Sequence, residues 1–328
     1  MPSEPGFRAL SRSPRLRANL HSVTFMTSPK PSSWAILALT GLAWGVSFPA
    51  MRVALEALTP LTIVAIRLSI AAAVIWAVAR ARGYRLPGWE TQTERRIWVA
   101  SFGMAMLSNA LPFTLLMFSL QFVSAGFAGI TMAVVPLLVL PLGHWLLPDQ
   151  RLTARKVLGF AIGFVGVFVL IGPGILTPGT GGMAEGLARV GCILAALCYA
   201  LGSIVTRRAP PGPSLVFTAA ALLMATCIMV SLALLVEGLP TAGTPSAWLA
   251  VAYLGLIPTA LATLMLVYLI KREGPAFLSL ANYQVPIWAV LLGTLFLDEV
   301  LPPSFLAALV LVLLGLAISQ ARIGRVRA

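Results

Sequence analysis

Charged residues are scarce in this sequence. Lysine, arginine, aspartate and glutamate make up 10% of its 328 residues, whereas hydrophobic residues make up 59%, and the mean hydropathy is +0.94. A soluble domain of this size could not bury so much apolar surface. The shortage of charge therefore predicts an integral membrane protein whose partner is the lipid bilayer.

Cysteine is almost absent as well. The three cysteines, Cys192, Cys198 and Cys227, all fall in apolar segments, and none forms a CxxC pair. That pattern argues against a disulfide framework and against a metal site made of paired cysteines. We expect neither a metal nor a cofactor.

The motifs of the common catalytic centres are missing too. The sequence contains no HExxH, no GxSxG and no phosphate-binding P-loop, and no aspartate or histidine pair falls inside an apolar segment. We therefore expect no catalytic residues and no enzymatic activity. A membrane-embedded enzyme, a channel and a non-transporting sensor or scaffold remain as alternatives to a transporter.

What the chain does contain is a series of ten apolar segments. Each is about 20 residues long, the length that a helix needs to cross ~30 Å of hydrocarbon. The segments cover residues 33–53, 60–80, 97–120, 125–147, 155–172, 186–206, 214–236, 247–270, 276–297 and 303–321. We therefore expect an all-α integral membrane protein with ten transmembrane helices.

The basic residues are distributed unevenly between the two sides of these segments. All lysines and arginines except Arg52, Arg67 and Arg189 fall in the two tails or in loops after even-numbered segments, whereas acids such as Glu56 and Glu237 follow odd-numbered ones. This bias predicts that both termini are cytoplasmic, and it accounts for the net charge of +13 without a nucleic-acid partner. The tails are residues 1–31, in which Met26 offers a second start, and residues 321–328.

Two halves of the chain resemble each other at an offset of 150 residues. Phe127 then aligns with Phe277, Val135-Pro136 with Val285-Pro286, and Asp149 with Glu299. Because each half has five segments, an odd number, the second half enters the membrane from the opposite side. Two inverted five-helix repeats of this kind are a recurrent design of alternating-access transporters.

These landmarks resemble a known family. The Trp44-Gly45 pair with Phe48, the Val-Pro step in the fourth and ninth segments, and an acid that closes both segments are similar to EamA-type permeases of the drug/metabolite transporter superfamily. The resemblance implies two modules, 33–172 and 186–320, in a bacterial inner-membrane permease, often an exporter of amino acids or other small metabolites. The first module ends in Pro148-Asp149 where the second has Asp298-Glu299, and we expect the latter pair to lie in a solvated loop.

Polar groups at membrane depth are the first candidates for a transport pathway, because they are costly there unless they pair or line water. Arg67 in the second segment could hold a substrate carboxylate. Alternatively it lies close enough to the segment's outer end to extend its charge to the surface, or it pairs with Glu56. The sequence favours neither alternative.

Amides and aromatic residues complete the candidate substrate-binding set. Asn109 lies near Pro112, and its partner in the repeat is Thr259. The amides can bind a polar ligand, or can join neighbouring helices instead. The aromatic residues can line a cavity, or can simply pack in the core. The full set is Trp44, Phe48, Arg67, Asn109, Tyr199, Asn282, Tyr283 and Gln284. We expect a small-molecule substrate, and the sequence allows a homodimer without requiring one.

Overall fold

The computed structural model describes residues 30–146, 153–171, 182–240, 243–273 and 281–320. Within these ranges the chain is helical and has no strands. The elements in order are α2 (Pro31–Leu55), α3 (Pro60–Ala81), α4 (Gln92–Ala105), the π-helix η2 (Met106–Ala110), α5 (Leu111–Ser119), α6 (Ala125–Met132), α7 (Val135–Leu146), α8 (Ala154–Ile171), α9 (Gly182–Arg208), α10 (Ser214–Val236), α11 (Pro245–Leu254), the π-helix η4 (Gly255–Leu261), α12 (Ala262–Glu273), α14 (Ala281–Leu297) and α15 (Pro303–Gln320).

The helices are long and apolar enough for a membrane protein. Within the described residues, seven helices can cross a bilayer by length and composition when helices that follow one another directly are counted together. They are Pro31–Leu55, Pro60–Ala81, Gln92–Ser119, Ala125–Leu146, Gly182–Arg208, Ser214–Val236 and Pro245–Leu266. The other three predicted segments contain α8, α14 and α15, which are apolar but are not among those seven. The fold is therefore that of an integral membrane protein, and the predicted tails, residues 1–31 and 321–328, lie almost entirely outside the described residues.

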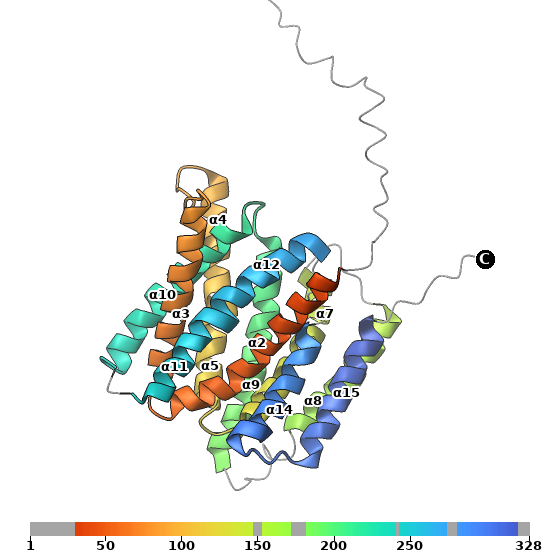
Figure 1. Cartoon of the computed structure of the whole chain (residues 1–328). Coiled ribbons are helices and arrows are strands. Elements are labelled where there is room, and N and C mark those ends of the chain that lie inside the picture. Colours follow the sequence, from red (N-terminus) through yellow and green to blue (C-terminus); the bar gives the residue numbers. More distant parts are fainter. Residues whose placement is uncertain (1–29, 147–152, 172–181, 241–242, 274–280, 321–328) are drawn as a thin grey trace, which may run out of the picture.

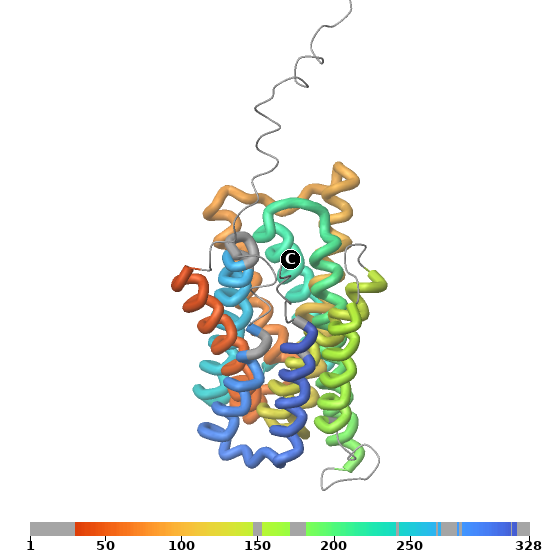
Figure 2. The backbone as a smooth tube through the Cα atoms, turned by 90° about the vertical axis from the view of Figure 1, so that its right-hand side faces the viewer, coloured from red at the N-terminus to blue at the C-terminus, as the bar shows by residue number. Residues whose placement is uncertain are grey.

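The long helices pack side by side in a bundle (Figure 1), and the view turned by 90° shows their shared direction (Figure 2). Small residues set the closest approaches between them. A Cβ added to Gly45 of α2 would lie 2.3 Å from the Cβ of Trp288 on α14, and one added to Gly315 of α15 would lie 2.4 Å from the carbonyl oxygen of Gly159 on α8. Glycine at these two positions thus lets the backbones of neighbouring helices approach closely.

The beginnings of the helices follow from local sequence. Proline occupies the first turn of α2, α3 and α11, where its missing N–H costs nothing. Thr91 caps α4 and forms a capping box with Glu94, and the hydrogen bonds from Thr91 hold the pKa of the Glu94 carboxyl below its usual value. These signals fix where the helices start, and the apolar segments fix how far they run.

Two carboxylates from the second half of the chain cap helices of the first half. Glu237 accepts hydrogen bonds from the backbone amides of Leu61 (3.0 Å) and Thr62 (2.8 Å) at the start of α3. Glu299 accepts them from Ala125 (2.6 Å) and Gly126 (2.9 Å) at the start of α6. A helix N-terminus carries about half a positive charge, so a carboxylate is stabilising there.

The cap on α6 corrects the expectation for the Asp298-Glu299 pair. Asp298 is exposed, but Glu299 is half-buried and bonded to α6 instead of standing in a solvated loop. The turn that delivers it is unusual, because Asp298 has a φ of +51° and is the sole non-glycine residue with positive φ in the described chain. The amide of Glu299 donates to the carbonyl of Gly293, which closes the turn at the end of α14.

Candidate functional site

Two π-helices occupy matching positions in the two halves. Asn109 lies in η2 and its amide donates to the carbonyl of Met104, five residues earlier (3.1 Å). Thr259 lies in η4 and its hydroxyl donates to the carbonyl of Leu254, again five residues earlier (2.8 Å). Asn109 and Thr259 are the pair that the offset of 150 aligns. A π-turn inside an α-helix is rare and is found frequently at functional sites.

Proline explains part of the geometry at η4. Pro258 has no N–H, so the carbonyl of Leu254 one turn earlier loses its α-helical donor. The Thr259 hydroxyl supplies a replacement donor. Trp44 of α2 reaches the same segment, because its indole N–H donates to the carbonyl of Pro258 (3.1 Å). A polar backbone group at membrane depth is therefore satisfied by a side chain from the other half.

Arg67 is the central polar group of this region. Its side chain is 3% exposed, and its Nε donates to the Thr259 hydroxyl at 2.8 Å. One guanidinium nitrogen lies 4.0 Å from the sulfur of Met51, and the guanidinium carbon lies 3.7 Å from the centre of the Phe113 ring. Arg67 thus joins α3 and α5 of the first half to η4 of the second.

Burial of Arg67 excludes both structural alternatives that the sequence left open. A side chain that is 3% exposed does not extend to the surface, and Glu56, its other expected partner, is exposed and makes no ion pair with it. Among the described residues the ion pair found joins Arg189 to Glu185. A buried arginine at the centre of a helix costs about 2.5–3.5 kcal/mol on insertion scales, and a cation–π contact returns about 0.5–2 kcal/mol.

Aromatic residues surround the guanidinium. The Phe113 ring meets the Tyr199 ring edge to face at a centroid distance of 6.4 Å. Tyr199 thus lies beside the ring that the Arg67 guanidinium covers, and Tyr253 lies on α11, in the turn before η4. The Tyr253 hydroxyl donates to the carbonyl oxygen of Ala43 at 3.2 Å, and Ala43 directly precedes Trp44 in the chain. The structure therefore brings Arg67, Tyr199 and Trp44 of the predicted set into one neighbourhood.

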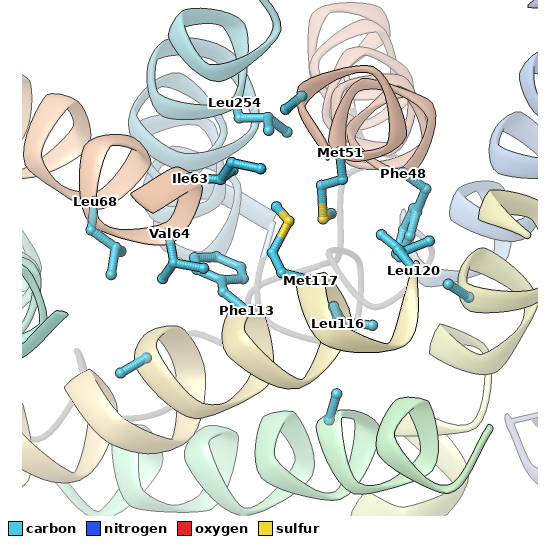
Figure 3. Close-up of a cluster of buried hydrophobic side chains, with 14 of the residues drawn as sticks. Phe48, Met51, Ile63, Val64, Leu68, Phe113, Leu116, Met117, Leu120 and Leu254 are labelled. Atoms are coloured by element: carbon cyan, nitrogen blue, oxygen red, sulfur yellow. The ribbon is translucent and has the colours of Figure 1, made fainter. Parts of the chain in front are cut away.

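The remaining predicted residues lie elsewhere or cannot be placed. Phe48 is buried in the apolar core, on the side of Leu120 and Met51 in Figure 3. Asn109 bonds within its own helix, and Gln284 packs against Gly41, whose added Cβ would lie 2.8 Å from the Gln284 Cβ. The side chains of Asn282 and Tyr283 lie outside the described residues.

Several residues of this neighbourhood are absent from the predicted set. Phe113 and Met51 gave no signal beyond being apolar, since nothing local distinguishes a ring under a guanidinium from a ring in the core. Tyr253 and Thr259 carried a weak signal, because Thr259 aligns with Asn109 and adjoins Pro258. The caps Glu237 and Glu299 could not be found from local sequence, because each lies more than 170 residues from its partner.

A cavity opens at the end of the bundle where Glu299 caps α6. It has a volume of about 380 Å³ and is lined by Arg52, Leu55, Glu56, Gln121, Leu297 and Glu299. The Arg52 guanidinium donates to the carbonyl of Leu120 at the end of α5. Residues of both halves thus form the walls of one polar cavity, and Arg67, which is buried, is not among its lining residues.

Comparisons with known proteins agree with this fold. The model of the EamA-like transporter family matches residues 32–172 and again 187–320, so the chain belongs to that family. An uncharacterized transporter of Archaeoglobus fulgidus is 26% identical over 286 residues, which are 87% of this chain and 97% of that protein. The uncharacterized inner membrane transporter YedA of Escherichia coli is 27% identical over 77% of this chain and 79% of its own length.

The fold also matches a solved crystal structure. The TM-score is 0.60 at 21% identity, and the match covers 89% of this chain and 97% of the other. At this identity the likeness concerns the fold alone. Together with the family match, it identifies the chain as a membrane transporter of the EamA family.

Proposed function

We propose that this protein is an inner-membrane transporter that exports small metabolites, such as amino acids, by alternating access. Its ten membrane-spanning helices form two inverted five-helix repeats, 33–172 and 186–320, and both termini are cytoplasmic. The observation that carries the proposal is the pair of π-helices, one in each half, in which Asn109 and Thr259 make the same bond to a carbonyl five residues earlier. Interruptions at corresponding positions of two inverted repeats point to the binding site in transporters of this design.

Contacts between the halves supply the two-state element. Arg67, Trp44 and the carboxylates of Glu237 and Glu299 each join a helix of one half to a helix of the other. In the proposed topology both carboxylate caps lie at the periplasmic face. A substrate shifts such an equilibrium by the difference between its affinities for the two states. The closed packing around Arg67 corresponds to one state of this cycle.

The candidate binding residues divide by their contacts. Arg67, Tyr199 and Trp44 line the site in this proposal. Asn109 in η2 and Gln284 at the contact between α14 and α2 lie where these helices repack between the two states in this proposal. Phe48 packs behind the binding residues, in the apolar core. Asn282 and Tyr283, which follow Ala281 on α14, complete the proposed substrate-binding set.

Counterflow in proteoliposomes tests the proposal. Purified protein is reconstituted into liposomes loaded with an unlabelled mixture of amino acids, purines or sugars, and entry of each labelled compound is followed. Accumulation of label beyond that in protein-free liposomes, saturating with substrate concentration, supports transport. Cys227→Ser is the control variant and should retain this activity, because the Cys227 side chain is exposed on the bundle surface. Absence of exchange for every mixture, with a folded protein, contradicts it.

A further inference from the structure

The charge of Arg67 is not balanced by any group that the structure describes around it. Its hydrogen-bond acceptor is the hydroxyl of Thr259, which is neutral and gives its own hydrogen to Leu254. Its other neighbours are the sulfur of Met51 and the ring of Phe113, which are also uncharged. A guanidinium held in this way at membrane depth lacks a counter-ion.

The carboxylates whose side chains the structure describes are capping, paired or exposed elsewhere. Glu237 and Glu299 cap helices at one end of the bundle, Glu94 belongs to the capping box of α4, Glu185 pairs with Arg189, and the other described carboxylates, those of Glu56, Glu90 and Asp298, are exposed. None of these contacts leaves a carboxylate near Arg67. Among the described residues no carboxylate neutralises Arg67, and a ligand can supply the missing negative charge.

We infer that Arg67 binds a carboxylate of the transported substrate, so that the substrate class is that of organic acids, amino acids included. This inference rests on the proposed transport function and deepens it. The planar guanidinium matches a carboxylate with two parallel hydrogen bonds, which a lysine cannot do. The Tyr199 ring meets the Phe113 ring that the guanidinium covers, so Tyr199 belongs to the same neighbourhood.

Binding of a carboxylate would also break a contact between the halves. The bond from Arg67 on α3 to Thr259 on η4 links the first half to the second. A charged acceptor displaces a neutral hydroxyl, because hydrogen bonds between ions are roughly twice as strong. Loss of the bridge then favours the state in which the halves have moved apart at this level.

The test compares acids with their amides. Thermal unfolding and counterflow are measured for matched pairs, such as leucine with leucinamide and glutamate with its diamide, on wild-type protein, Arg67→Gln, Arg67→Lys and Thr259→Val. Arg96→Gln, at an exposed position near the start of α4, controls for net charge. We expect wild-type protein to bind and exchange acids but not amides. We expect exchange by Arg67→Gln to fall by at least about tenfold, with Arg67→Lys intermediate, because truncating a buried charged partner weakens binding strongly.

The empty protein gives an independent readout. If Arg67 serves the ligand, Arg67→Gln keeps or raises the melting temperature without ligand, because an uncompensated buried charge has been removed. A lowered melting temperature, with the acid-induced shift intact, would show a purely structural bridge and overturn the inference. Equal exchange of acids and amides would overturn it while leaving transport standing. Exchange of nothing would overturn the proposed function as well, and the inference with it.

Discussion

The carboxylate of Glu299 lies 2.6 Å from the backbone nitrogen of Ala125, across 174 residues of sequence. A second oxygen of the same group accepts from Gly126, so one side chain satisfies two of the free amides at the start of α6. Glycine at 126 leaves room for it, since an added Cβ would lie 3.3 Å from the carboxylate. The end of α14 and the beginning of α6 are thereby fastened together.

Removal of this cap should destabilise the protein. We expect Glu299→Ala to lower the free energy of unfolding by about 0.5–2 kcal/mol, as loss of a helix cap does. Glu299→Gln should lose less, because its amide oxygen still accepts one bond. Thermal unfolding of the purified protein in detergent measures both. Glu56→Ala, at an exposed acid of the same cavity, is the control. Equal melting temperatures for Glu299→Ala and wild type would contradict the capping role.

The turn before Glu299 should tolerate glycine and reject a branched residue. Asp298 has a φ of +51°, a region that aspartate visits and that β-branched residues avoid. We expect Asp298→Val to cost about 1–3 kcal/mol of stability and Asp298→Gly to change it little. The same unfolding measurement distinguishes them. A loss with glycine as large as that with valine would mean that the carboxylate of Asp298, and not its backbone, is required.

The indole of Trp44 should matter through its N–H group. We expect Trp44→Phe to destabilise the protein by about 1–3 kcal/mol, because the carbonyl of Pro258 then loses its donor at membrane depth. Tyr253→Phe, which removes the donor to Ala43, is the matched comparison on the neighbouring contact. Hydrogen exchange at η4 should rise in Trp44→Phe. Unchanged exchange there would show that the ring packs without anchoring the π-helix.

The contact between α15 and α8 leaves no room for a side chain at Gly315, not even the single carbon of alanine. A Cβ at Gly315 would lie 2.4 Å from the oxygen of Gly159 and 2.5 Å from the nitrogen of Gly163. Both are backbone atoms that cannot turn aside, so we expect Gly315→Ala to cost about 1–3 kcal/mol or to abolish folding. Gly212→Ala, where nothing lies within 4 Å, should be neutral. Expression level and melting temperature report both. A neutral Gly315→Ala would mean that the two helices are less tightly packed than described.

The start of α4 should respond to acid. Hydrogen bonds from Thr91 lower the pKa of Glu94 from its ordinary value of 4.5, so the folded cap favours the charged carboxylate. Its contribution is therefore complete above that ordinary pKa and is lost as the pH falls through the lowered value. Amide hydrogen exchange in the first turn of α4 should accelerate over this acid range. Glu94→Gln should remove the pH dependence; if it persisted, another group would be responsible.

The sequence predicted an all-helical membrane protein, and seven of the ten predicted segments coincide with helices that can cross a bilayer, but it did not predict the contacts between the helices. The apolar segments mark the helices because burial in lipid demands long uninterrupted apolar stretches. The offset of 150 residues also aligned Asn109 with Thr259, and in the structure both residues lie in π-helices. Arg67 was found because a cation at membrane depth stands out in any sequence.

Its partners could not be predicted in the same way. Every helix face is apolar in a membrane protein, so periodicity does not say which neighbour a side chain meets. The contact of Phe113 with the Arg67 guanidinium and the contact of Glu299 with the start of α6 are long-range contacts of this kind. Glu56, close to Arg67 in the chain, was the natural local partner, and the burial of Arg67 shows why proximity in sequence misled.

The two π-helices shift the phase of the lipid-facing surface. Along α11, η4 and α12 the exposed side chains of Leu249, Leu256, Leu261 and Tyr268 are separated by seven, five and seven residues. At about 100° per residue a step of seven returns almost to the same side, but a step of five would turn the stripe by about 140°. The wider π-turn takes back about 100° of that rotation, which keeps the stripe continuous. Val99, Leu111 and Phe118 repeat the positions of Leu249, Leu261 and Tyr268 in the first half. The π-turn thus keeps the exposed apolar side chains of this helix in one continuous stripe. The sides of the helix that face its neighbours before and after the π-turn point in different directions.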